Sequence, residues 1–110
     1  MTNPRPDLLQ GTLDLLILKA LQLGPLHGWA IGKRIGQMSR EVLGVSQGSL
    51  YPALYRLEDR GWIAGEDARS PEGRLVRRYR LSAAGKKQLG KEAQAWRLFA
   101  GAMSDVLGTD

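Results

Sequence analysis

The sequence contains no cysteine and a single histidine, His27. The lack of cysteine excludes disulfide bonds, thiolate nucleophiles and cysteine-ligated zinc, and it is compatible with a reducing cytoplasm. No second metal ligand or nucleophile stands at a useful spacing from His27, so we expect this residue to cap or pack rather than to catalyse. The sequence therefore predicts no enzyme activity, no metal site and no cofactor.

Long hydrophobic runs are also missing. The most apolar stretch, residues 8–21, is interrupted by Asp14 and Lys19 and is too short to span a membrane. Its apolar residues recur at helical spacing on nearly all sides, which predicts a helix over residues 8–23 that is covered on more than one side. We expect a buried helix and no membrane partner.

What the sequence does contain is a surplus of basic residues. The 110 residues carry 16 Lys and Arg against 11 Asp and Glu, a net charge of +5, and 43% are apolar, enough for one small core. Ten basic and six acidic residues lie between positions 24 and 81, so most of the surplus falls in the middle of the chain. This distribution favours a polyanionic partner.

Helical spacing and turn residues predict two further helices in this middle part. The first covers about residues 28–39, and the second follows the predicted N-cap Ser46, runs for roughly fourteen residues and is closed by Gly61. Pro52 falls in the second helix. We expect it at the first turn, where proline is tolerated because the N–H that it lacks would be unpaired anyway.

Two extended segments follow, at about residues 62–66 and 75–81, on either side of the turn-rich stretch DARSPEG. Two helices, a short turn and a hairpin match winged helix-turn-helix geometry, in which the second helix reads DNA and the hairpin is the wing. We predict a mainly α fold with a small β-hairpin wing. A winged helix-turn-helix domain would cover residues 1–82, and a long C-terminal dimerisation helix residues 83–110.

The reading helix carries an unusual mixture on its outward arc. Tyrosine and arginine at this spacing suit contacts to base edges and thymine methyl groups in the major groove, and tyrosines that merely cover the surface are the alternative. The arc consists of Gly48, Tyr51, Pro52, Tyr55, Arg56 and Asp59.

Arginines also gather in the predicted wing. Arg69 and Arg74 flank its tip and, together with Arg78, could reach phosphates or a minor groove without much base selectivity. The alternative is a simply solvated basic strand.

Ser82 is a suitable N-cap for a last helix of roughly twenty-five residues. An apolar stripe along it steps by four and three residues, as in a coiled coil. So small a domain cannot cover so long a helix, which predicts a homodimer in which the first and last helices pack against their mates. Trp96 on this stripe is either core or one of two tryptophans that stack a flat ligand. The stripe consists of Leu89, Ala93, Trp96, Ala100, Met103 and Leu107.

The chain resembles the PadR family of transcriptional regulators over nearly its whole length. The resembling segments are LLQGTLDLLILKAL, LHGWAIGKRI, SLYPALYRLEDRGWI and GRLVRRYRLSAAGKKQL, of which the third is quite specific. The resemblance implies a winged helix-turn-helix dimer of the short subgroup. Such a protein is usually a repressor that binds inverted-repeat operators in double-stranded DNA, in some cases until a small effector releases it.

The resemblance also implies the binding residues. Some members bind planar aromatic compounds between tryptophans of the last helix, at the place where Trp96 stands. A different class of function, a winged-helix module whose basic face meets an acidic protein partner, is the alternative. The implied DNA-binding residues are Gln47, Ser49, Tyr51, Pro52, Tyr55 and Arg56 of the reading helix, and Arg74 and Arg78 of the wing.

Overall fold

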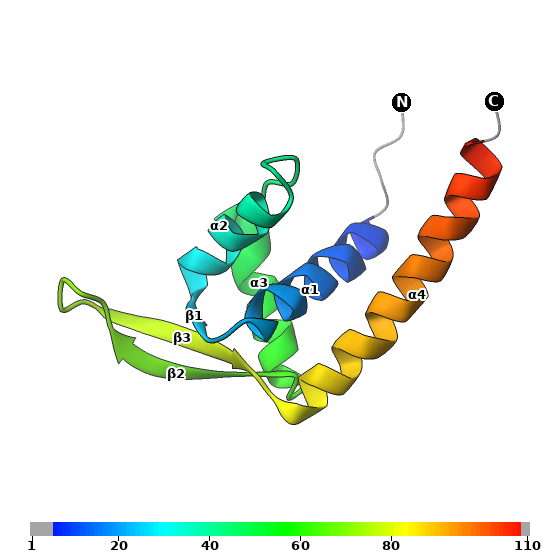
Figure 1. The fold of residues 1–110 in the computed structure, drawn as a ribbon. Coiled ribbons are helices and arrows are strands. Elements are labelled where there is room, and N and C mark those ends of the chain that lie inside the picture. Colours follow the sequence, from blue (N-terminus) through cyan, green and yellow to red (C-terminus); the bar gives the residue numbers. More distant parts are fainter. Residues whose placement is uncertain (1–5, 109–110) are drawn as a thin grey trace.

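The computed structural model describes residues 6–108, with side chains from residue 11 onward. It confirms the predicted mainly α fold with a hairpin wing (Figure 1). The ends of the two predicted domains, residues 1–5 and 109–110, lie outside the described residues. The elements in chain order are α1 (Pro6–Gln22), β1 (Leu26–His27), α2 (Gly28–Met38), α3 (Gln47–Asp59), β2 (Ile63–Arg69), β3 (Leu75–Leu81) and α4 (Ala83–Leu107).

Helix α1 lies at the centre of the core. Its residues Ile17, Leu18 and Ala20 are fully buried, and the helix contacts α2, α3, α4 and β3. The expectation of a helix covered on several sides is therefore confirmed. The other elements contribute nine side chains to the same core, namely Ile31 and Ile35 of α2, Leu50, Ala53, Leu54 and Leu57 of α3, Ile63 of β2, Tyr79 of β3 and Leu89 of α4.

Helix α3 begins directly after Ser46, which is its N-cap as predicted. The Ser49 backbone N–H donates to Ser46 Oγ at 3.2 Å. The expected position of Pro52 was wrong, because the helix starts at Gln47 and the proline therefore lies inside it. Pro52 has no N–H to offer the Gly48 carbonyl four residues earlier, and since Gly48 is exposed, water can satisfy that carbonyl.

The wing is a hairpin of β2 and β3, extended by a third strand that the sequence analysis did not predict. The two-residue strand β1 pairs with β3, giving the order β1-β3-β2. At the tip, Pro71 follows Ser70 in a tight turn closed by a hydrogen bond from the Gly73 N–H to the Ser70 carbonyl at 2.8 Å. Gly73 has a φ of +83°, a conformation that glycine adopts without strain.

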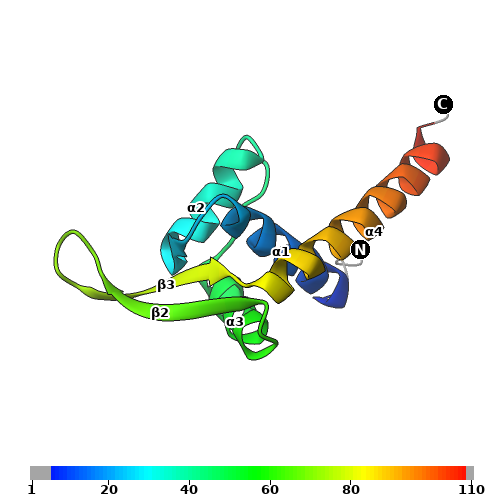
Figure 2. The same cartoon turned by 60° about the horizontal axis from the view of Figure 1, so that its bottom comes forward.

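Helix α4 leaves the body of the molecule on the side opposite to the wing (Figure 2). Ser82 caps it as predicted, because its Oγ accepts a hydrogen bond from the Gly85 N–H at 2.9 Å. The first turn of α4 packs closely against Trp62, the residue before β2. A Cβ on Gly85 would overlap the Trp62 carbonyl oxygen and lie 2.8 Å from a methyl group of Leu81. This contact sets the point from which the long helix departs.

We expect Gly85→Ala to lower the free energy of unfolding by about 3 kcal/mol, since the backbone of Trp62 cannot yield as a flexible side chain would. Gly90 of the same helix is the matched control. A Cβ there meets nothing within 4 Å, so Gly90→Ala should raise the free energy of unfolding by about 0.5–1 kcal/mol. Urea unfolding measures both, and equal effects would contradict the proposed close contact.

Candidate nucleic-acid interface

The exposed side of α3 carries five of the six DNA-binding residues that the family resemblance implies for this helix. Gln47, Ser49, Tyr51, Pro52 and Tyr55 are all exposed, and the helix buries its apolar residues on the other side. Of the two tyrosines, Tyr55 is the more exposed, with 76% of its surface accessible. A helix that presents tyrosine, glutamine and serine to solvent in this way offers both ring faces and hydrogen-bonding groups to a partner.

Tyr51 is positioned by the start of α2. A Cβ on Gly28 would lie 3.0 Å from Tyr51 Cε1 and 3.2 Å from its hydroxyl, so the glycine makes room for the ring. Tyr51 nevertheless keeps 43% of its surface exposed. The helix-turn-helix packing therefore orients this ring while leaving part of it accessible.

Arg56 differs from the expected outward placement. Its guanidinium Nη2 donates to Asp14 Oδ1 of α1 at 2.8 Å, and only 26% of its side chain is exposed. The physical reason is its place on α3, where it borders the buried Ala53 and Leu57, together with the pull of a carboxylate inside the core. This ion pair was not predicted from the sequence, although an acidic residue within an apolar helical run was the available signal.

The wing arginines fall into two groups. Near the tip, Arg74 is exposed, and Arg69 donates to the Gly73 carbonyl at 3.0 Å. On the strands, Arg78 is paired with Glu66 at 3.0 Å, and Arg77 donates to Glu58 of α3 at 2.6 Å. Within residues 11–108, Arg74 at the tip and Arg80 on β3 are exposed and have no ion-pair partner, so no described carboxylate holds either guanidinium.

A hollow of about 470 Å³ lies between α3 and the wing. The hydrogen bond to Glu58, and the charge of that carboxylate, raise the pKa of Arg77 above its ordinary value. Burial, and again the charge of Glu58, raise the pKa of the Tyr79 phenol. Arg77 therefore stays charged and Tyr79 neutral at physiological pH. The hollow is lined by Tyr51, Tyr55, Glu58, Asp59, Arg77 and Tyr79.

His27 lies at the N-terminus of α2, where its ring stacks on Trp29 with centroids 6.3 Å apart. The side chain packs but makes no capping hydrogen bond. Across the described side chains, no group of three or more His, Cys, Asp and Glu residues is arranged to hold a metal ion. Likewise, none of the helices within residues 6–108 has the length and hydropathy of a membrane span.

The predicted stripe on α4 divides into two parts. Leu89 is only 5% exposed and Ala93 packs against the core, so the start of the stripe is covered by α1 of the same chain. Leu89 is thus largely unavailable to a second subunit, unlike the expectation from the sequence. Beyond this point Trp96, Met103 and Leu107 are exposed, Ala100 is partly so, and Phe99 and Val106 add exposed apolar surface.

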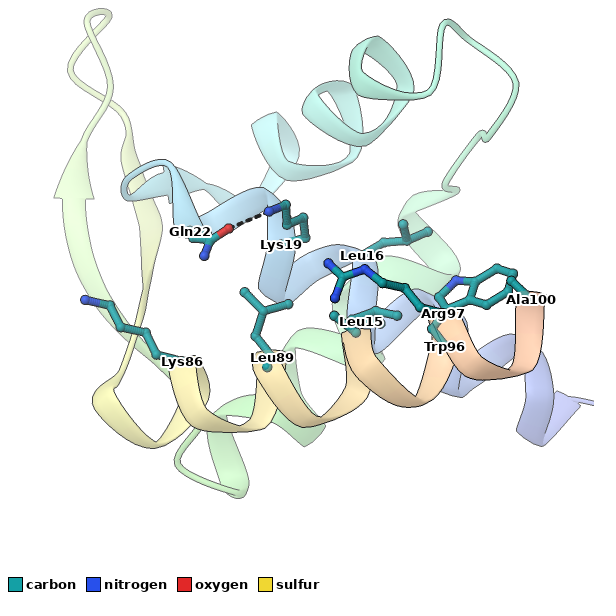
Figure 3. A pocket seen from close by; sticks show the side chains of 11 residues that line it. Leu15, Leu16, Lys19, Gln22, Lys86, Leu89, Trp96, Arg97 and Ala100 are labelled. Carbon is teal, nitrogen blue, oxygen red and sulfur yellow. Dashed lines mark hydrogen bonds between the residues drawn. The ribbon is translucent and has the colours of Figure 1, made fainter. Parts of the chain in front are cut away.

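Trp96 lies between two hollows at the α1–α4 junction. The larger, of about 510 Å³, is lined by Leu15, Leu16 and Lys19 of α1 and by α4 residues that include Trp96 and Arg97 (Figure 3). The second, of about 430 Å³, lies on the side of Phe99, whose ring centroid is 6.0 Å from that of Trp96. The indole is thus accessible from both sides in the isolated chain.

The chain matches a family model described as "Transcriptional regulator PadR-like family" over residues 17–91. This range contains α2, α3 and the wing, together with the last six residues of α1 and the first nine of α4. The fold is also that of a transcriptional regulator from Clostridium thermocellum. The two are 26% identical with a TM-score of 0.82, over 92% of this chain and 98% of the other.

Two further proteins are similar in sequence over shorter parts of the chain. The chain is 41% identical over 59 residues to a transcriptional regulator of Mycobacterium tuberculosis, which is 54% of each chain. It is 39% identical over 82 residues to an uncharacterized 37.1 kDa transposon protein of Streptomyces fradiae. That match covers 74% of this chain but only 22% of the larger protein. The matched range and the shared architecture together place this chain in the PadR-like family of transcriptional regulators.

Proposed function

We propose that the protein is a homodimeric repressor that binds a pseudo-palindromic operator in double-stranded DNA in the cytoplasm. Two copies of α3 would enter successive major grooves on one face of the duplex, about 34 Å or a small multiple of it apart. The observation that carries the proposal is the exposed face of α3, where Tyr51 and Tyr55 stand beside an arginine-bearing wing.

In this proposal, α3 and the wing make different kinds of contact with DNA. Gln47, Ser49, Tyr51, Pro52 and Tyr55 face the base edges, because they are the side chains that α3 presents to solvent. Arg74 and Arg78 contact phosphates or the minor groove, which supplies affinity that depends little on sequence.

The proposed dimer uses the exposed part of α4 as its contact. Helix α4 carries many exposed apolar side chains along its second half. Such a surface is unusual for a helix that stays in contact with water and is typical of an interaction site. Pairing with the α4 of a second copy would cover them around a two-fold axis, as a pseudo-palindromic operator requires. Trp96, Ala100, Met103 and Leu107 would form this contact.

A small planar aromatic effector is part of the same proposal. The hollows on the two sides of Trp96 have volumes in the range of small-molecule sites, and the indole supplies a flat surface for stacking. Binding there would change the α1–α4 junction, and with it the spacing of the two α3 helices.

The experiment is a selection from a pool of random duplexes, followed by titration of the selected DNA at near-physiological salt with excess random competitor. Selection of an inverted repeat that is bound at nanomolar protein supports the proposal. A protein that retains no duplex in preference to another would refute it and would favour an acidic protein partner for the basic face.

Tyr55→Ala tests base contact by α3. Because this side chain is mostly exposed, the free energy of unfolding should stay unchanged within about 0.5 kcal/mol. Affinity for the selected operator should fall about 10- to 100-fold, the range for one lost base contact, and affinity for random DNA should change little. Equal losses on both duplexes would show that Tyr55 does not read bases.

Arg74→Ala tests the wing. It should weaken binding to operator and to random DNA alike, and it should reduce the slope of log K against log salt by about one, since one phosphate contact is lost. Lys91→Ala is the matched control, because it removes the same charge from an exposed position on α4. The wing assignment fails if both variants change the salt slope equally.

Met103→Asp tests the dimer. Met103 is half-exposed in the single chain, so the substitution should leave the protomer folded but place a charge in the proposed contact. We expect sedimentation to show monomers. Gln94→Asp, on the opposite side of α4 by helical geometry, should remain dimeric. A Met103→Asp dimer that still binds operator would mean that the dimer forms through another surface.

A further inference from the structure

We propose that Arg56 positions the recognition helix α3 instead of reading DNA, and that it does so together with Glu58. Both residues lie in the last turns of α3, and both are tied to neighbouring elements of the same chain. The inference rests on the proposed function, because it concerns how α3 is aimed at an operator. Three observations support it.

The first observation is the burial of Asp14. Among the side chains that the structure describes, it is the only buried charged one, with 6% of the residue exposed. A carboxylate in such a place is strongly destabilising unless a cation accompanies it, and Arg56 is the cation within reach at 2.8 Å. If Arg56 swung out to a base, it would leave Asp14 buried and unpaired. The pair is therefore expected to persist when DNA binds.

The second observation is the pair on the other side of the helix. Glu58 accepts a hydrogen bond from Arg77 of β3 at 2.6 Å, and Arg77 also contacts Asp67 of β2 at 3.3 Å. Residues two positions apart lie about 200° apart around a helix. Arg56 and Glu58 thus hold α3 from nearly opposite sides, one against α1 and the other against the wing. We call these two ion pairs the α3 clamp.

The third observation is the place of Tyr55 within the clamp. By helical geometry its side chain projects between those of Arg56 and Glu58, about 100° from the first and about 60° from the second. Tyr51 lies one turn earlier on the same side. Rotation of α3 about its axis would move both rings, and contacts to base edges tolerate displacements of only about 0.5 Å. The clamp therefore bears on the residues proposed to read bases, although its own members need not touch DNA.

This arrangement predicts that neutralising Asp14 or Glu58 weakens operator binding, whereas charge alone predicts tighter binding. Asp14→Asn and Glu58→Gln each remove a negative charge from a protein that binds a polyanion, which by itself would tighten binding. If the clamp positions α3, both should instead weaken operator binding by about tenfold while leaving random-DNA binding unchanged or slightly tighter. The ratio of the two affinities is the quantity to measure.

Glu72→Gln is the matched control. Glu72 lies in the turn between β2 and β3, is exposed, and takes part in none of the ion pairs between described side chains. Its neutralisation should leave the operator preference intact and tighten both kinds of binding slightly. Thermal unfolding of every variant separates a misdirected α3 from an unfolded one.

A double variant keeps the test decisive if Asp14→Asn does not fold. Asp14→Leu with Arg56→Met replaces the buried ion pair by apolar side chains, a change that folded proteins often tolerate. If Arg56 only positions α3, the double variant should keep operator binding within about threefold of the original protein, since packing replaces the pair. If Arg56 reads a base, the double variant should lose operator preference as severely as Arg56→Ala.

Two results would overturn the inference. One is tighter operator binding by Asp14→Asn or Glu58→Gln, comparable to that of Glu72→Gln. The other is loss of operator preference by the stable double variant. Failure of the proposed function looks different, because the unaltered protein would then show no operator preference at all, and both proposals would fall together.

Discussion

Burial of α1 is the constraint on which the rest of the structure depends. This helix is apolar on nearly every side, so it is stable only where other elements enclose it, and α2, α3, α4 and β3 all contact it. A chain of 110 residues has few elements to spare for this purpose. The helices that enclose α1 must therefore also supply the functional surfaces, with one face packed inward and the other exposed. Helix α3 shows this most clearly, because Leu50 and Leu54 are buried while Tyr51 and Tyr55 are exposed.

The lengths of α1 and α4 explain why a large apolar surface is left over. At the usual rise the 17 residues of α1 extend about 25 Å and the 25 residues of α4 about 37 Å, so one helix cannot cover the other along its whole length. Leu89 is enclosed by the core, whereas Met103 and Val106 are exposed. The apolar spacing is continuous through this change. The same sequence pattern therefore serves the core of the single chain at one end and, in our proposal, a second subunit at the other.

Features that depend on local spacing could be predicted from the sequence, and those that depend on a distant partner could not. The helices, the hairpin and the caps Ser46 and Ser82 follow from periodicity and from a hydroxyl placed before each helix. Strand β1 has only two residues and exists through its pairing with β3, so no local pattern marks it. Arg56 was placed on the outward side because helical geometry gives the angular position of a residue but not the partners of its side chain. Its actual partner, Asp14, is 42 positions away and lies on a helix whose packing angle the sequence does not specify.

The net charge of +5 does not show how many arginines can bind phosphates. An arginine that is already in an ion pair can bind a phosphate only if that pair is exposed enough to be exchanged. Arg78 and Glu66 are about half-exposed, and such pairs contribute only about 0–1 kcal/mol, so a phosphate can replace the carboxylate at little cost. Arg56 has a buried partner that water cannot solvate, so the same exchange would be unfavourable. Two arginines that look equivalent in the sequence thus differ in function. In our proposal, the exposed Arg78 exchanges its partner for a phosphate, and the half-buried Arg56 holds the helix that reads the DNA.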